Sequence, residues 1–552
     1  MPSTLYVSNF GDGSLSIANV QAAIDAAAAG DTVVMHAGSA TWGAGATYLL
    51  VNKAITLQGQ GDDTHITLTT DGPTYTSATI RLSNAPTVRD FKVTNVGSAT
   101  TAFSTTGTNG WRITGINYSE TGSSPFGYFV YVGNNYGLID DCDVAGGGGT
   151  NELIFVRGPT DAWQTAVDYG SANAVYIENN RFTGSGYVCD ANSNSRVVVR
   201  RNTIAGAMKV DGHGVASNSP ARGVRMMEVY DNTWTGSGGF PTYVELRGGT
   251  GRAFNNVATL STTGTFLLRE YGCVSTWSNF DNKYQTPADY PILDQIGVGI
   301  DPKTAASEPY YLWLNRRGGS QWPISYGAAI PDGAKTQYAI DLGDPDGDPP
   351  VSFTMADVIA PDRDFFNESA TFDGSSGVGI GTKAQMEAIT PSLTGVGFWV
   401  TDEGTWDTTA EGTSGQLYIW DGAAWGLDYT PYTYPHPRVG SAPTAPSDLT
   451  ATATGSSTID LAWTDASSDE TGFKIERSLN GSTGWTQIGT AAADATSYSD
   501  TGLSSGTAYY YRVRAYNTYG NSAYSASAND TTDAAPTVGA GRYVGSGAAA
   551  MF

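Results

Sequence analysis

Five asparagines recur at one position of a repeated pattern, and this recurrence constrains the fold more than any other feature. Successive copies lie 22, 30, 24 and 26 residues apart; the five are Asn180, Asn202, Asn232, Asn256 and Asn282. Each follows a short alternating apolar run, and such a period is typical of one rung of a solenoid. We expect each asparagine at a turn, where the residue tolerates left-handed backbone and its amide can bond to the next copy along the stack.

The segments around this repeat predict short strands with no helix between them. Residues 20–38 are expected to form a short amphipathic helix and then a strand, and residues 53–61 a strand that ends in a glycine turn. Alternating runs such as YFVYVG, AVYIENN, RVVVRRN and VRMMEVYDN follow. Strands repeated at rung spacing predict an all-β solenoid rather than a doubly wound fold.

The opening helix, GDTVV, KAITLQGQG and the NNRFTG-type turns resemble right-handed parallel β-helix proteins of the pectate-lyase superfamily. The resemblance covers roughly residues 1–300. It implies a right-handed parallel β-helix with a short N-terminal capping helix. Lyases, hydrolases, phage tailspikes and adhesins share this architecture, so the resemblance implies a fold and not one activity.

The rest of the chain divides into three further parts. Residues 301–441 are expected to hold late rungs with an insertion and an aromatic hairpin that turns at Asp421-Gly422, and to return to the solenoid before residues 433–437. Residues 442–533 resemble a fibronectin type III domain, a β-sandwich. The residues that carry this resemblance are Trp463 in the second strand, Leu503 and Tyr509 at a corner, and Tyr511, Val513 and Ala515 alternating inward. Residues 534–552 read as a flexible tail, either disordered or docked by its aromatic end on a partner.

Composition excludes several classes of partner. A net charge of −24 argues against nucleic acid and against simple attachment to an anionic membrane. No apolar run is long enough for a membrane span. Cys142, Cys189 and Cys273 are far apart, and we expect buried free thiols at the first two. MPSTLYVSNFGDGSL has no signal-peptide pattern, which favours export by cell lysis.

Charged residues fall into a strip when the strands LIFVRG, YVCDAN, KVDGHG, YVELRG and LLREYG are stacked. Residues two apart in a strand share a face, so the strip contains Arg157, Asp211, His213, Glu245, Arg247 and Arg269. One interpretation is a saccharide-binding groove with Asp211, His213, Glu245 and Arg247 as catalytic candidates. The alternative is that these side chains only pair with one another across rungs.

Weaker signals add two candidate sites and one partial resemblance. Asp344, Asp346 and Asp348 alternate around a glycine and could hold Ca²⁺, although a plain acidic loop explains them as well. Trp163 lies in a long loop and is a candidate sugar platform, whereas Trp234, Trp406, Trp420 and Trp425 are expected to pack in the core or the hairpin. Gly212-His213-Gly214 is similar to a polygalacturonase tripeptide, but that family's other motifs are absent, so hydrolase activity is not carried over.

Three functions remain open at this point. The favoured one is a virion structural protein, a phage fibre, spike or decoration protein on the virion surface that binds a host-surface glycan. We expect it to form a homo-oligomer and to contact other virion proteins, with the C-terminal tail as a candidate contact. The second is a secreted, extracellular polysaccharide lyase or glycoside hydrolase, and the third is a bacterial surface adhesin.

Overall fold

The computed structural model describes residues 3–535 with internal gaps. The residues outside the description are 1–2, 44–47, 70–77, 97–100, 108, 122–126, 148–151, 160–165, 214–222, 236–241, 260–264, 271–307, 329–359, 410–413, 439–442, 468–469, 518–519 and 536–552. The chain separates into two compact units, residues 1–436 and 437–552.

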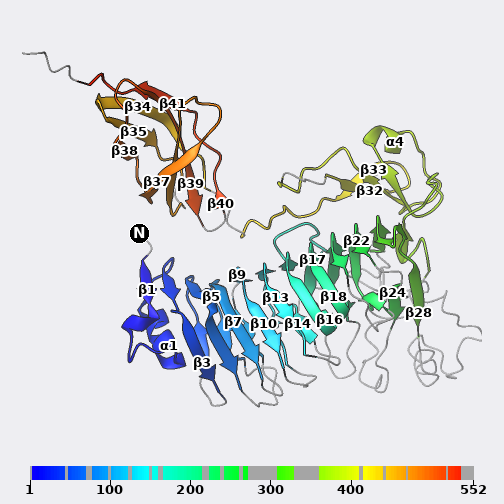
Figure 1. The fold of residues 1–552 in the computed structure, drawn as a ribbon. Helices are drawn as coiled ribbons and strands as arrows, with labels where there is room; N and C mark the ends of the chain where they lie inside the picture. Colours follow the sequence, from blue (N-terminus) through cyan, green and yellow to red (C-terminus); the bar gives the residue numbers. More distant parts are fainter. Residues whose placement is uncertain are drawn as a thin grey trace, which may run out of the picture. The chain divides into compact units, whose positions relative to one another are not determined.

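The first unit is a parallel β-helix whose rungs contribute to three stacks of strands (Figure 1). Stack 1 contains β1 (Thr4–Tyr6), β2 (Thr32–Val34), the first parts of β5 (Thr56–Leu68) and β7 (Thr87–Asn95), β9 (Trp111–Thr114), β12 (Gly137–Asp140), β15 (Val175–Glu178), β17 (Arg196–Arg200), β19 (Met226–Tyr230), β22 (Thr250–Phe254), β25 (Tyr310–Trp313) and β29 (Phe365–Asn367). The expected all-β solenoid is confirmed.

The other two stacks run beside it. Stack 2 contains β3 (Gly38–Trp42), the second parts of β5 and β7, β10 (Asn117–Glu120), β13 (Asp143–Ala145), the first parts of β16 (Arg181–Asn192) and β18 (Thr203–Gly212), β20 (Thr233–Trp234), β23 (Val257–Ala258) and β26 (Arg316–Arg317). Stack 3 contains β4 (Leu49–Val51), β6 (Ile80–Leu82), β8 (Phe103–Thr105), β11 (Val130–Gly133), β14 (Glu152–Arg157), the second parts of β16 and β18, β21 (Thr242–Leu246), β24 (Thr265–Glu270) and β28 (Ile324–Ala328).

A short helix covers the N-terminal end of the β-helix, as expected (Figure 1). Helix α1 (Ile17–Ala26) begins after Ser16, whose side chain accepts a hydrogen bond from the backbone N–H of Asn19. Such a cap satisfies a donor that the first helical turn leaves unpaired. Val20 and Ile24 on the inner side of the helix are fully buried in the same core as the rungs.

The asparagines form a hydrogen-bonded ladder at the turn between stacks 1 and 2. Each Nδ2 donates to the Oδ1 of the next ladder residue, at 3.1, 2.9, 3.0 and 2.8 Å; in order the ladder is Asn180, Asn202, Asn232, Asn256 and Asn315. The predicted amide stacking is therefore confirmed for the first four. The fifth position belongs to Asn315, while the predicted Asn282 lies outside the described residues.

The left-handed backbone of each turn lies one residue earlier than predicted. Positive φ angles of 52–58° occur at the residues that precede the ladder, namely Asn179, Arg201, Asp231, Asn255 and Leu314. Asparagine suits the ladder position because of its side chain. A buried amide must form hydrogen bonds through both its NH₂ group and its oxygen, and the ladder provides partners for both. Asn232 shows this fully, since Nδ2 also donates to Val199 O at 2.8 Å and Oδ1 also accepts the backbone N–H of Asn202.

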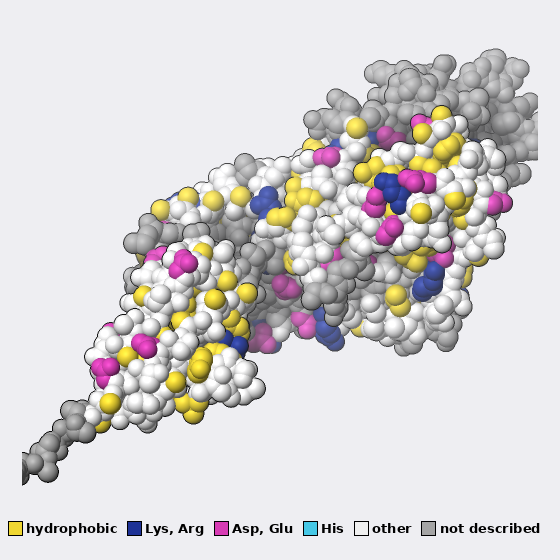
Figure 2. All heavy atoms as spheres, turned by 90° about the horizontal axis from the view of Figure 1, so that it is seen from above, with side chains coloured by type: hydrophobic (Ala, Val, Ile, Leu, Met, Phe, Trp, Pro, Cys, Tyr) yellow, Lys and Arg dark blue, Asp and Glu magenta, His cyan; other side chains and the backbone are white. Residues whose placement is uncertain are grey.

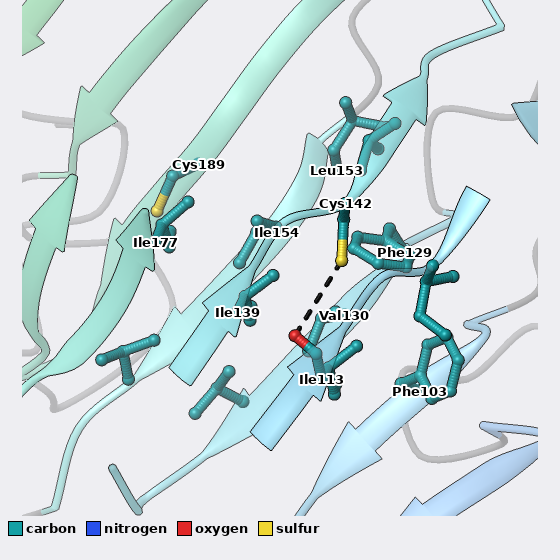
Figure 3. Close-up of a cluster of buried hydrophobic side chains, with 14 of the residues drawn as sticks. Phe103, Ile113, Phe129, Val130, Ile139, Cys142, Leu153, Ile154, Ile177 and Cys189 are labelled. Atoms are coloured by element: carbon teal, nitrogen blue, oxygen red, sulfur yellow. Dashed lines mark hydrogen bonds between the residues drawn. The ribbon is translucent and has the colours of Figure 1, made fainter. Parts of the chain in front are cut away.

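Aliphatic and aromatic side chains stack inside the rungs (Figure 3). Ile113, Ile139 and Ile177 line up along stack 1, and Val130, Ile154 and Cys189 along stack 3. Cys142 and Cys189 are free, buried thiols, as predicted, and Cys273 lies outside the described residues. Burial raises the pKa of both thiols, and the Cys142 thiol donates to Asp140 O at 3.2 Å.

Residues beyond the rungs build a small sheet and then turn back. β30 (Val378–Gly381), β31 (Gly397–Val400), β32 (Gln416–Trp420) and β33 (Trp425–Tyr429) form this sheet, with α4 (Lys383–Glu387) beside it. β32 and β33 pair antiparallel around Asp421, where the aromatic hairpin is expected. The return segment, residues 428–436, does not become another rung. It lies against the outer face of stack 1.

The contacts of the return segment explain this difference. The buried guanidinium of Arg200 donates to Glu178 Oε2 at 2.7 Å and to the carbonyl oxygens of Tyr432 and Thr433 at 2.6 and 3.0 Å. Arg252 pairs with Asp428 at 2.6 Å. The segment is therefore held by polar groups that point out of stack 1, which an apolar rung could not satisfy.

The second unit is an antiparallel sandwich. One sheet contains β34 (Ser447–Gly455), β35 (Thr458–Thr464) and β38 (Ser497–Thr501); the other contains β36 (Gly472–Ser478), β37 (Thr486–Ala492), β39 (Ala508–Asn517), β40 (Gly520–Asn521) and β41 (Ala528–Thr531). Trp463 and the alternating inward residues of β39 form its core. Tyr509 Oη accepts the backbone N–H of Ser504 at 3.1 Å, which fixes the predicted corner.

Candidate functional site

Ionisable side chains gather on the outer face of stack 3, across β14, β16, β18 and β21. We call this group the carboxylate cluster; it consists of Glu152, Asp190, Asp211 and Glu245 with Lys209 and Arg247. The strand register places Asp190 beside Asp211, and Asp211 beside Glu245. Adjacent strands lie about 4.8 Å apart, so side chains in one column touch.

Two cations link carboxyl groups of neighbouring strands. Arg247 forms an ion pair with Asp211, and Lys209 forms one with Glu245. Lys209 Nζ also lies 3.9 Å from Asp211 and 4.4 Å above the ring centre of Tyr187. The group therefore contains four carboxyl groups and two cations.

Burial and mutual repulsion keep protons on part of the cluster. Burial, followed by the charge of Asp211, raises the pKa of Glu152 to about 7. Burial raises the pKa of Asp190 well above its ordinary value, and Asp211 and Glu152 add to the effect. Since neighbouring carboxylates repel one another and are costly to bury, the protonated form of Asp190 is favoured.

Burial differs between the members of the cluster. Asp211 is fully buried and Asp190 is 3% exposed. One oxygen of each, Oδ1, accepts no hydrogen bond from the described part of the chain. The half-buried side chains Glu152, Tyr187 and Arg247 form the edge that faces outward. A ligand at this edge would meet both a carboxyl group and a guanidinium.

Charged residues are sparse on this molecule. Only 15% of the residues are charged. On the face shown in Figure 2, charged side chains stand singly or in small groups among uncharged ones. Perturbed and partly buried ionisable groups in one place are a common mark of a functional site.

The sequence-predicted residues are only partly in this site. Asp211, Glu245 and Arg247 come together as the stacked strands suggest. His213 follows β18, is half-buried, and donates its backbone N–H to Ala191 O at 2.7 Å. Arg157 is exposed at the end of β14. Arg269 is a residue of β24 whose side chain is not described, and Trp163, Asp344, Asp346 and Asp348 lie outside the described residues.

Three members of the cluster were missed from the sequence. Asp190 is predictable, because stacking YVCDAN on KVDGHG places it beside Asp211, and the two aspartates are register partners in the structure. Lys209 could also have been found, because it lies two residues before Asp211 in KVDGHG and so shares its face. Glu152 had no such signal. Glu152 is the register partner of Tyr187, and the register of β16 against β18 shifts between Tyr187 and Cys189. A bulge of this kind reverses the alternation on which the prediction depends.

The tryptophans and a second acidic group do not add to this site. Trp234 and Trp406 are buried, and Trp420 and Trp425 pack edge to face in the hairpin. In the sandwich, carboxylate oxygens of Asp465, Glu470 and Asp494 lie within 4.8 Å of one another. Glu470 accepts the backbone N–H of Asp494 at 2.9 Å and the hydroxyl of Ser467 at 2.5 Å, so these carboxylates already close local turns.

Comparison with known proteins identifies the sandwich. The fibronectin type III family matches residues 444–531. These residues form a fibronectin type III domain. A fibronectin-like protein from Clostridium thermocellum is 33% identical over 16% of this chain and 92% of its own, with a TM-score of 0.15.

Two curated proteins share sequence with a part of the chain. An α-amylase of Niallia circulans is 45% identical over 96 residues, which is 17% of this chain and 7% of that protein. Exoglucanase B of Cellulomonas fimi is 43% identical over 101 residues, 18% of this chain and 8% of that protein. The chain thus spans under a tenth of the length of either relative. No helix among the described residues is long and apolar enough to cross a membrane.

Proposed function

We propose that the β-helix binds a cell-surface polysaccharide at the carboxylate cluster and that the protein is displayed on a virion as a fibre, spike or decoration protein. Its resemblance to the pectate-lyase superfamily, its assembly into a homo-oligomer and contacts of its tail with other virion proteins belong to the same proposal. Display as a secreted, extracellular protein or as an adhesin is the alternative.

The carboxylate cluster is the observation that carries the proposal. Buried charges cost several kcal/mol of desolvation each, at an order of magnitude, and apolar replacements are often as stable. Here the register indicates that an apolar residue fits, because Phe155 on β14 is the partner of Asp190 in the same column. The fold therefore does not require charges at Asp190, Asp211 and Glu245. Binding of a polar ligand is a reason to keep them.

Two further observations support the proposal. The relatives that share sequence with this chain are named as an α-amylase and an exoglucanase, so such segments occur in proteins that act on carbohydrate. The buried free thiols Cys142 and Cys189 suit a protein that folds in a reducing cytoplasm, as virion proteins do before release.

Binding is tested by affinity electrophoresis of the full chain in gels that contain bacterial surface polysaccharides. Arg247→Gln removes the guanidinium at the edge of the cluster, and loss of one charged hydrogen bond should weaken retention about tenfold. Arg181→Gln is the matched control, because Arg181 pairs with Asp143 at an exposed position of stack 2. Equal retention of wild type and Arg247→Gln in every gel would refute the assignment of the site.

Display on a virion has a separate test. Mass spectrometry of purified particles from a candidate phage should detect peptides of this chain in stoichiometric amounts. Absence from the particles, with glycan binding intact, would leave the secreted protein or the adhesin.

Polysaccharide hydrolysis is a second candidate, favoured by the pKa of Glu152. A carboxyl group with a pKa of about 7 can donate a proton to the leaving glycosidic oxygen at neutral pH, and the cluster contains further carboxyl groups from which the second acidic residue of such a reaction could come. Lyase chemistry fits less well, because the Arg247 guanidinium is paired with Asp211, which holds its proton more tightly. A reducing-end assay should show activity that Glu152→Gln abolishes, whereas an absorbance rise from unsaturated products would indicate a lyase.

A further inference from the structure

A second polar surface lies on the fibronectin type III domain, independent of the β-helix. Residues 443–533 contain four basic residues, and three of them, Lys474, Arg512 and Arg514, lie on the outer face of the sheet formed by β36 and β39. Their strand neighbours Phe473 and Val513 point into the core. Alternation along the strands therefore turns the cations outward.

Aromatic rings alternate with the guanidinium groups on this face. The Arg512 guanidinium lies 4.4 Å from the ring centre of Trp485 and 3.7 Å from that of Tyr524. Arg514 follows on the same Tyr524 ring at 4.6 Å. Lys474 Nζ lies 4.9 Å from the ring centre of Tyr516. We call this set the arginine–aromatic face.

The charges on this face are incompletely neutralised. Glu476 accepts two hydrogen bonds from Arg512, at 2.6 and 2.9 Å, and one from Tyr524 at 2.7 Å. Arg514 reaches Glu476 at 3.4 Å only, and its Nε has no partner in the described residues. Lys474 makes no ion pair within the same residues.

Lys474 and Arg514 are also direct register partners on β36 and β39. Like charges directly opposite each other on adjacent strands destabilise a sheet. Bridging by an anion would reverse this effect, and a carboxylate has two oxygens that can engage both groups.

We infer that the arginine–aromatic face binds a saccharide that carries a carboxylate group. The carboxylate bridges Lys474 and Arg514, and the half-buried rings of Tyr516 and Tyr524 contact the apolar faces of the sugar rings. Nucleic acid fits less well, because it presents one phosphate after another while this face offers only two cations without a short ion pair, on a chain of net charge −24.

The experiment compares retention of the full chain in gels that contain polygalacturonate and in gels with its methyl-esterified form, which keeps the polymer and removes the charge. The double variant Lys474→Gln/Arg514→Gln should bind polygalacturonate at least about tenfold more weakly. Arg477→Gln is the matched control, because this cation pairs with Asp500 on the other side of β36. Esterified polymer should retain no variant.

Further controls distinguish loss of binding at this face from misfolding and from binding at the carboxylate cluster. Lys474→Arg/Arg514→Lys keeps both charges and should retain binding, while thermal unfolding checks that each variant is folded. All variants are repeated in an Arg247→Gln background, where the same loss should appear. Wild-type retention of the Gln double variant, or equal retention in the esterified gel, would overturn the inference, as would binding to dextran sulfate with none to polygalacturonate.

Discussion

Replacing Glu152 by glutamine should make the β-helix more stable at alkaline pH. The pKa of Glu152 is about 7 in the folded chain against an ordinary 4.5. A carboxyl group whose pKa is raised by folding stabilises the protein below 4.5 and loses this contribution as the pH rises through about 7. Glutamine keeps the shape and cannot ionise, so the variant is spared the cost of burying the charge.

The size of the effect follows from the linkage relation. Each pH unit between the two pKa values is worth 1.36 kcal/mol, so the full interval corresponds to about 3 kcal/mol. Between pH 5 and pH 8.5, the stability of Glu152→Gln relative to wild type should rise by about 2.5 kcal/mol. A change in hydrogen bonding caused by the substitution alters the free energy of unfolding equally at pH 5 and at pH 8.5, so it does not affect the difference between the two pH values.

Denaturant unfolding of the full chain, followed by far-ultraviolet circular dichroism at both pH values, measures this change. Glu387→Gln at an exposed position of α4 is the matched control for the loss of one carboxyl group. An infrared band of a protonated carboxyl group near neutral pH should also weaken in Glu152→Gln. A stability difference that stays constant from pH 5 to pH 8.5 would refute the electrostatic account of the cluster.

Three other outcomes follow from the fold. Asn232→Ala removes the amide that links two neighbouring ladder residues, and leaving buried partners unsatisfied should lower the free energy of unfolding by about 2–4 kcal/mol in denaturant titrations. Arg200→Ala strands the buried carboxylate of Glu178 and should cost about 3–5 kcal/mol, with faster limited proteolysis at the return segment as its local signature. Cys142 and Cys189 should stay unmodified by a thiol reagent in native protein and react fully in denaturant, as peptide mapping can show.

The rung pattern was readable from the sequence because it is local. Alternating apolar runs and a polar residue at each turn recur within some 30 residues, so they survive without knowledge of distant contacts. The same pattern was present in YLWLNRR, where Asn315 completes the ladder. The prediction chose Asn282 in FDNKY because it follows Asn256 at the usual spacing of 26 residues. The next ladder residue in the structure, Asn315, follows Asn256 only after 59 residues.

Features that depend on distant contacts were not readable. The return segment meets stack 1 through Arg200 and Tyr432, which are 232 residues apart and carry no periodic signal. In the carboxylate cluster, Asp211 and Glu245 are placed by simple stacking, whereas the position of Glu152 depends on a strand irregularity. Strand alternation predicts the face of a residue only as far as the next bulge.

The asparagine ladder has a consequence for how such a protein can vary. Asn256 and Asn315 are hydrogen-bonded neighbours although 59 residues separate them along the chain. The alignment of one rung on the next therefore depends on the amide contacts and not on the number of residues between them. Doubling the length of a flexible loop costs only about 0.6 kcal/mol. Loops between the strands of one rung can therefore differ in length and sequence while the ladder keeps its register. Loops that bind different ligands can therefore replace one another between two ladder asparagines, while the strands and the ladder stay the same.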